Sequence, residues 1–254
     1  MLMFDIATDI AFNELERIIE NLPTDSSEAT RRSNLLFIDR LGKPECITSI
    51  LNQLLNNSQI LARVASRSYR HVNHFDKIVL VDSEHQQGYR LTLHLWNPPY
   101  TEKELNDELI HDHRFSFWSN ILTGNLECEN FSRSDTGSVF RRYQYTPEKR
   151  TLSNFYTFVG EETIVKTKPS TKIAGQSYYL SYETIHRVIL PKTSMTCTLV
   201  LRGPRQRNYS NILNTMYPTT NVQVFSSTFS PDELKVKISE LLASISTRLA
   251  LEMV

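Results

Sequence analysis

Two histidines stand one residue apart at the start of the segment IHDHRFSFWSNILTGNLECENF, residues 110–131. The Phe, Trp and Ile residues that follow favour a β-strand, in which alternate side chains share a face. His111 and His113 would then project together, with Asp112 on the opposite face. Two neutral imidazoles on one face can bind one metal ion. The same pattern also fits two hydrogen-bonded strand histidines without an ion.

Two glycines and a third histidine add a regular spacing to this pair. Gly124 lies eleven residues after His113, and Gly175 lies eleven residues before His186. These residues resemble the two motifs of the cupin superfamily. The first motif is His-x-His, three or four residues, Glu, six residues and Gly. The second is Gly, five residues, Pro, one residue, Gly, two residues and His. The resemblance covers about residues 70–205.

The chain departs from the cupin motifs at three positions. Phe117 stands where the superfamily has its glutamate, and Ser181 and Glu183 replace the Pro and Gly of the second motif. Three histidines without the acid are similar to the thiol dioxygenase branch, that is, cysteine dioxygenase and its relatives. The segments IHDH, LTGNLECENF, IHRV and TLVLRGP resemble that branch as well.

The resemblance to thiol dioxygenases implies that three histidines alone hold an Fe(II) ion. Here these would be His111, His113 and His186. Three neutral imidazoles leave the full divalent charge on the metal, with about three open positions for an anionic substrate and dioxygen if the metal is six-coordinate. We therefore predict a non-haem Fe(II)-dependent cupin dioxygenase, a metal-dependent oxidoreductase. Its substrate would be a small polar molecule, amino-acid-like or a thiol or carboxylate.

Two other functions remain open from the residues alone. Imidazole ligands also suit zinc or nickel, so the ligand types do not name the metal. A zinc or nickel site with an open position is typical of a lyase, an isomerase or a hydrolytic enzyme. The barrel could also be a non-catalytic cupin that binds a small molecule. Bound metal separates the enzymes from the binding protein, and oxygen dependence separates the two kinds of enzyme.

Strand alternation nominates further residues around the histidines. It places Phe115 and Phe117 on the face of the paired histidines, and Tyr182 and Val188 on the face of the third. A mostly apolar lining with a few polar groups is typical of a small-molecule pocket, although it is equally typical of any barrel core. Tyr182 is the candidate in this group that could take part in catalysis.

Two arginines are candidates for binding the substrate. The Ser-His-Tyr series that thiol dioxygenases carry beside the iron aligns with Thr198, Val200 and Arg202, so the assisting imidazole and phenol are replaced here. If these residues face inward, Arg202 can hold a carboxylate through two hydrogen bonds and assist catalysis; the alternative is an exposed arginine at the end of a strand. Arg70, in SYRHV, is the nearest candidate for the carboxylate-binding arginine of that family.

The elements that must position these residues divide the chain into three parts. Residues 1–67 are predicted to be a helical region packed on the barrel, because AFNELERIIENL and KPECITSILNQLLNN show a helical period. Residues 68–229 hold short strands separated by turn residues and predict the cupin β-barrel. Residues 230–254 predict an amphipathic helix capped by Ser230. The expected fold class is α+β, mainly β: a cupin-type antiparallel β-barrel (jelly roll) with N-terminal helices and a C-terminal helix.

The amino-acid composition limits the classes of molecule that this protein is expected to bind. The 254 residues include 28 Lys and Arg and 28 Asp and Glu, so the net charge is zero, which argues against nucleic-acid or membrane-surface binding. Three cysteines without a CxxC pair are typical of reduced thiols in a cytoplasmic protein. The N-terminal segment has no basic leader and no long apolar run, so we expect neither a signal peptide nor a membrane span. The expected partners are a small-molecule substrate and dioxygen, and a homodimer is compatible with the sequence.

Overall fold

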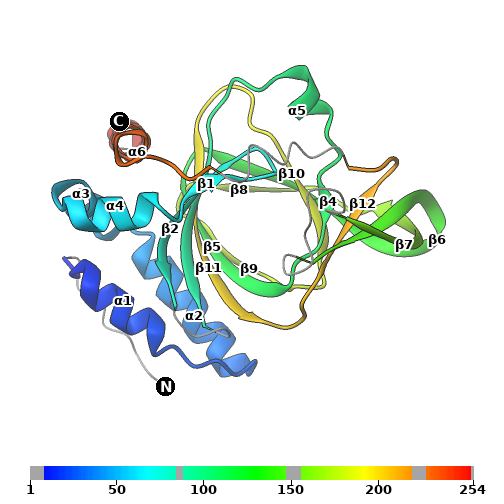
Figure 1. Cartoon of the computed structure of the whole chain (residues 1–254), viewed down its shortest axis with the longest axis horizontal. Coiled ribbons are helices and arrows are strands. Elements are labelled where there is room, and N and C mark those ends of the chain that lie inside the picture. The colour runs from blue at the N-terminus through cyan, green and yellow to red at the C-terminus, as the bar shows by residue number, and fades with distance from the viewer. Residues whose placement is uncertain (1–8, 84–87, 147–155, 219–226, 253–254) are drawn as a thin grey trace.

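The computed structural model describes residues 9–83, 88–146, 156–218 and 227–252. Four helices precede the strands and a long one follows them (Figure 1). The helices are α1 (Phe12–Glu20), α2 (Glu28–Leu41), α3 (Pro44–Asn56), α4 (Ser58–Ala65), α5 (Glu102–Asn106) and α6 (Pro231–Glu252). None of those helices combines the length and the apolar character that crossing a membrane requires.

Twelve strands in the described residues form two antiparallel sheets. Sheet 1 has the order β1-β2-β3-β11-β5-β9, and its strands are β1 (Tyr69–Arg70), β2 (Asp76–Asp82), β3 (Arg90–Trp96), β11 (Thr196–Arg205), β5 (Phe115–Thr123) and β9 (Ser177–Leu180). Sheet 2 contains β10 (Ile185–Ile189), β4 (Ile110–His111), β12 (Ser210–Asn214), β6 (Asn125–Tyr145), β7 (Thr157–Lys166) and β8 (Ser170–Ile173). In sheet 2, β6 pairs with β7, β8, β10 and β12.

The order of eight of these strands identifies the fold. The core of sheet 1 reads β3-β11-β5-β9, and the core of sheet 2 reads β4-β10-β6-β8. A chain that places its strands in this order in two facing sheets is a double-sheet jelly roll, the architecture of cupins. The predicted fold class is therefore confirmed, including the helices at both ends of the chain.

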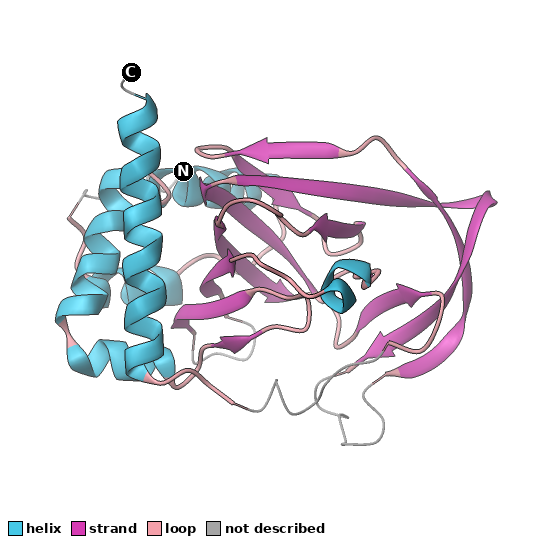
Figure 2. Ribbon diagram, turned by 90° about the horizontal axis from the view of Figure 1, so that it is seen from above, coloured by secondary structure: helices cyan, strands magenta, loops and turns pink. Residues whose placement is uncertain are grey.

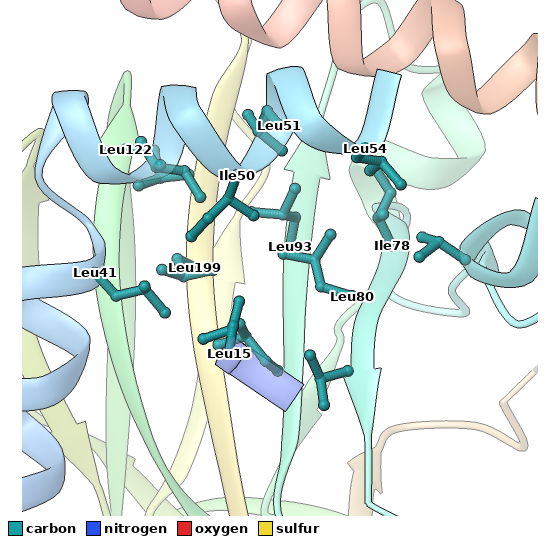
Figure 3. Packing of buried hydrophobic residues seen from close by; sticks show 14 of the residues in the cluster. Leu15, Leu41, Ile50, Leu51, Leu54, Ile78, Leu80, Leu93, Leu122 and Leu199 are labelled. Carbon is teal, nitrogen blue, oxygen red and sulfur yellow. The ribbon is translucent and has the colours of Figure 1, made fainter. Parts of the chain in front are cut away.

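Helices α1–α4 and α6 cover the outer face of sheet 1, which is the face turned away from sheet 2 (Figures 1 and 2). Strand residues such as Ile78, Leu93 and Leu199 pack there against Ile50 and Leu54 of α3, and all five are completely buried (Figure 3). Each such side chain stabilises the fold by about 1.5–3 kcal/mol. Because strand residues alternate in direction, the residues between these apolar ones must face sheet 2.

Local signals set where the helices begin. Ser27 caps α2 by accepting a hydrogen bond from the Thr30 amide, and Asn57 caps α4. Ser230 caps α6 as predicted, since its hydroxyl accepts from the Glu233 amide at 3.2 Å. The predicted boundaries at 67/68 and 229/230 fall between elements. That the three segments are separate units stays a prediction.

Several strands differ from the sequence interpretation. The run 111–122 is not one strand, because β4 ends at His111 and β5 begins at Phe115, where the chain crosses from sheet 2 to sheet 1. Residues 125–145 form one long strand, β6, in place of the short strands separated by turn residues that the sequence predicted. Helix α5 and strands β8 and β12 are additions. The predicted short strands include NFYTFVG, residues 154–160, of which residues 154 and 155 lie outside the described residues.

Candidate metal centre

Three histidines converge between the two sheets. His111 ends β4, His113 lies in the crossing that follows, and His186 is in β10. The register of β4 with β10 places His186 directly opposite His111. One ligand atom from each ring lies within 4.8 Å of the others, and Nε2 of His113 is 2.8 Å from Nε2 of His186. The structure thus brings together the three residues that the sequence nominated.

The physical reason for this convergence differs from the one predicted. The interpretation that His111 and His113 share a face of one strand is wrong, because the strand ends between them. His113 is positioned instead by hydrogen bonds of its backbone. Its N–H donates to the carbonyl of Tyr182 at 3.1 Å, and its carbonyl accepts from Nη2 of Arg207 at 2.8 Å and from Nε at 3.1 Å.

Asp112 anchors the crossing from the opposite side. Its buried carboxylate forms an ion pair with Arg207. It also accepts hydrogen bonds from the backbone N–H of Asn211 at 2.7 Å and from the side-chain amide at 2.6 Å. Arg207 therefore links Asp112 and His113. This clamp, defined as Asp112, Arg207 and Asn211, fixes the backbone that carries His113.

The three imidazoles are suited to metal binding because burial keeps them neutral. Burial lowers the pKa of His113 and of His186 well below 6.5, and the neighbouring histidines lower both further. Burial also lowers the pKa of His111, against an opposing hydrogen bond to the Leu109 carbonyl. A neutral imidazole has a nitrogen lone pair available for a metal ion.

Hydrogen bonds orient the His111 ring. Its Nδ1 is 2.7 Å from the Leu109 carbonyl oxygen, to which it donates. That tautomer leaves the Nε2 lone pair free to act as an acceptor or a ligand, an arrangement common among metal-binding histidines. Nε2 accepts from the side-chain amide of Asn73 at 3.3 Å. Asn73 lies in the turn between β1 and β2, which the sequence analysis did not connect to the site.

Aromatic side chains line one side of the cluster. The Phe117 ring lies edge-on to His113, with ring centroids 5.1 Å apart, and the Phe115 ring lies 5.7 Å away. Phe117 is 7% exposed, so an apolar ring occupies the position of the cupin glutamate. Val188 follows His186 by two positions in β10 and packs in the apolar cluster between the sheets.

The three other nominated residues lie in different environments. Arg202 is 6% exposed, which excludes the alternative of an exposed strand end; its Nη2 donates to the Gly88 carbonyl at 2.7 Å. Arg70 forms ion pairs with Asp76 and Glu104. The Tyr182 hydroxyl donates to the exposed Glu183 at 3.2 Å and so points to the surface. That placement does not support the catalytic role predicted for Tyr182, and the substrate-binding roles of Arg202 and Arg70 stay predictions.

The two motif glycines have backbone conformations that explain their presence. Gly124 has φ +75° and Gly175 has φ +86°, both in the left-handed region that favours glycine. A Cβ at position 124 would lie 2.4 Å from Oγ1 of Thr196 and 2.6 Å from the Met195 carbonyl. Each glycine therefore turns the chain between strands of the barrel, which is how their spacing relates to the histidines.

Comparisons with known proteins add little to this picture. No protein family matches the sequence, and no curated protein matches it.

Solved structures with similar parts include the DMSP lyases RdDddP and RnDddQII, at 15% identity and a TM-score of 0.26 over 51% of this chain and 47% of that chain. Hydroxypropylphosphonic acid epoxidase from S. wedmorenis matches at 10% identity and a TM-score of 0.31 over 54% of this chain and 53% of that chain. A structure of Fe(II) HppE matches at 8% identity and 0.32, over 77% of this chain and 100% of that chain. The first two alignments span about half of those proteins. Similarities this weak carry no argument about activity.

The donor set itself fits a divalent metal ion. Metal–imidazole bonds of about 2.1 Å place neighbouring nitrogens about 3.0–3.4 Å apart, depending on geometry. The nitrogens of His113 and His186 are already at 2.8 Å, and all three donors lie within 4.8 Å. Small side-chain rotations would satisfy these bonds. Among the described residues, the cluster contains no carboxylate or thiolate ligand, so its three neutral donors suit iron, zinc or nickel alike.

Proposed function

We propose that this chain is a metal-dependent cupin enzyme in which His111, His113 and His186 hold Fe(II), and that it oxidises a small polar substrate with dioxygen. The observation that supports the proposal is the convergence of three neutral imidazoles, from β4, the crossing and β10, within 4.8 Å. An Fe(II) ion bound there would supply coordination positions for the substrate and dioxygen and would activate the dioxygen, which receives its electrons from the substrate. The substrate would be amino-acid-like, a thiol or a carboxylate.

The residues of the chain would contribute to this chemistry in three ways: they leave the metal charge uncompensated, they fix the position of His113, and they exclude water. Three neutral ligands leave the divalent charge uncompensated, so an anionic substrate gains more from binding than a neutral one. The clamp holds His113 by its backbone, which keeps the ligand geometry fixed. Phe115 and Phe117 exclude water on the side of His113, which strengthens electrostatic interactions at the site.

The state of the cysteines fits a reducing compartment, and we include a cytoplasmic location in the proposal. The three cysteines Cys46, Cys128 and Cys197 are free and buried. Burial raises the pKa of each thiol, so the reactive thiolate is disfavoured. Free thiols without a disulfide are typical of cytoplasmic proteins.

Metal analysis combined with oxygen uptake tests the proposal. The protein is purified without oxygen, and its metal content is measured after reconstitution with Fe(II), Zn(II) or Ni(II). We expect one equivalent of metal per chain, and oxygen consumption by the Fe(II) form with at least one member of a library of thiols, amino acids and carboxylates. Stoichiometric zinc together with no oxygen consumption by the Fe(II) form would overturn the dioxygenase proposal.

A pair of histidine variants makes the experiment specific. His186→Asn should lose most of the metal, because it removes one of three donors. His74→Asn removes a histidine that lies outside the cluster and bonds to Asp107 at 2.7 Å, so its metal content should equal that of the wild type. Equal metal loss in both variants would contradict the assignment of His186 as a ligand.

A further inference from the structure

Asn73 contacts the histidine cluster directly, although it lies far from all three histidines in the sequence. Its side-chain nitrogen Nδ2 is 3.3 Å from Nε2 of His111. Asn73 belongs to the tight turn that joins β1 to β2, in which the His71 N–H donates to the Phe75 carbonyl at 2.8 Å. This turn of sheet 1 therefore brings a polar side chain next to a residue of sheet 2.

The backbone of Asn73 is held in place by the ring of His71. The Asn73 N–H donates to Nδ1 of His71 at 3.2 Å. The His71 ring stacks on the Phe75 ring, with 4.5 Å between centroids, and Phe75 is buried in the apolar cluster between the sheets. These contacts fix the turn, so the side chain of Asn73 stays within reach of His111.

Backbone strain is concentrated on both sides of the contact between Asn73 and His111. Among the described residues, positive φ values outside glycine occur at His74, at +59°, and at Leu109, at +52°. This left-handed region is unfavourable for a residue that has a Cβ. His74 follows Asn73 directly, and the Leu109 carbonyl accepts from Nδ1 of His111 at 2.7 Å. Strain of this kind persists mainly where a functional geometry requires it, which indicates that the contact does more than fill space.

The distance between the two side chains suits two ligands of one metal ion. Donors that bind the same ion at about 2.1 Å each lie about 3.0–3.4 Å apart, and the 3.3 Å between Asn73 and His111 falls in that range. The Nε2 lone pair of His111 cannot bind an ion and accept the Asn73 N–H at once. Loading the site with metal must therefore break this hydrogen bond.

A half-turn of the terminal amide of Asn73 resolves this conflict. It exchanges Nδ2 with Oδ1 and presents an oxygen, which can bind a metal, in place of a donor, which cannot. In the part of the chain that the structure describes, Oδ1 has no hydrogen-bond partner. The rotation consequently breaks no hydrogen bond other than the one to His111, and it leaves the backbone of the turn unchanged.

We propose that Asn73 is a fourth protein ligand of the metal ion, which it binds through Oδ1 beside the three histidines. This inference rests on the proposed function, because it takes the three-histidine metal ion as given. The amide oxygen is neutral, so it adds a bond without reducing the divalent charge that attracts an anionic substrate. It leaves about two open positions on a six-coordinate ion instead of about three.

Metal affinity tests this proposal, because a ligand and a mere competitor predict changes of opposite sign. The full chain is titrated with Co(II) against a chromophoric chelator. If Oδ1 binds the ion, Asn73→Ala should lower the affinity by at least about 10-fold, the smallest loss typical of residues that only orient a ligand. If the amide only competes with the ion for the lone pair of His111, the same variant should bind Co(II) equally well or more tightly. That result would overturn the proposal.

A carboxylate variant and the cobalt spectrum give independent readouts. Asn73→Asp keeps an oxygen at the same place and should bind Co(II) at least as tightly as the wild type. At saturating cobalt, Asn73→Ala should shift the d–d absorption bands, because the ion loses an oxygen ligand. Asn106→Ala removes an exposed asparagine at the end of α5 and should match the wild type in both measurements.

The outcomes separate this inference from the proposed function. Unchanged absorption bands in Asn73→Ala, or an affinity of Asn73→Asp as low as that of Asn73→Ala, would overturn the role of Asn73 as a ligand and leave the three-histidine site intact. Failure of the wild type to take up Co(II) would instead overturn the proposed function.

Discussion

Replacing Lys77, the second residue of β2, by Met should make the protein more stable, which is unusual for a substitution in an interior. The lysine pKa falls from 10.5 in the unfolded chain to about 7 in the folded one, chiefly because of burial. Between those two values the unfolded chain holds a proton that the folded chain gives up. The free energy of unfolding therefore rises with pH across this window. The free-energy cost of burying Lys77 is greatest at pH 7 and below.

The size of the effect follows from the same two pKa values. At about 1.4 kcal/mol for each pKa unit, burying Lys77 costs about 4 kcal/mol at pH 7 and about 2 kcal/mol at pH 9. Met keeps an unbranched stem of similar length and carries no charge, so packing changes little. Lys77→Met should thus raise the free energy of unfolding by about 4 kcal/mol at pH 7 and by about 2 kcal/mol at pH 9.

Urea unfolding followed by tryptophan fluorescence at the two pH values measures this difference. The cysteines of the unfolded chain also lose protons in this range, but they are the same in both proteins and their contribution cancels when the variant is compared with the wild type. Lys103→Met, at an exposed position, should stay within about 0.5 kcal/mol of the wild type at both pH values. A destabilised Lys77→Met, or a gain that is equal at pH 7 and pH 9, would show that the lysine is paired or solvated in the folded protein.

Two other predictions concern the clamp and the turns. Arg207→Met removes the donors to the His113 carbonyl and should weaken metal binding about 10- to 100-fold, as measured by competition with a chromophoric chelator; unchanged affinity would mean that the arginine does not position the ligand. Gly124→Ala should lower the free energy of unfolding by about 2–4 kcal/mol, because φ is +75° and the new Cβ would meet Thr196 at 2.4 Å. Gly175→Ala, with φ +86° and nothing within 4 Å, should cost only about 1–2 kcal/mol in the same urea titration, and equal losses at the two glycines would contradict the steric argument.

The sequence predicted that these three histidines come together because their signal is local and repeated. Two histidines, a turn glycine at a fixed distance and the same distance before His186 reflect the constraints of a barrel, in which turns bring chosen strand residues to one place. The sequence left open whether residues 198, 200 and 202 face inward, and the structure answers this. Thr198, Val200 and Arg202 do face away from the helix-side core.

The remaining features of the interior depend on contacts between distant segments. In DKIVLV, Lys77 has the pattern of a residue on the solvent face of a half-buried strand, and only the second sheet makes that face an interior. Asn73 and Arg207 act through hydrogen bonds to His111 and His113, which lie 38 and 94 positions away in the sequence, and no periodicity reveals such pairs. The break between His111 and His113 was missed because the aromatic residues that follow favour a strand, whereas the crossing between the sheets is decided by strand pairing.

The helical layer on the outside of sheet 1 has a consequence for how this protein can change. Most of the apolar packing that stabilises the chain lies on the helix side of that sheet. The inward-facing side chains therefore contribute less to the stability of the fold. Threonine, serine, histidine and lysine can therefore occupy inward positions of β2, β3, β5 and β11 without loss of the fold. A descendant of this chain could therefore acquire a new ligand preference by substituting those inward side chains one at a time. Selection for stability acts mainly on the outer face of the sheet, and selection for ligand binding acts mainly on the inner face.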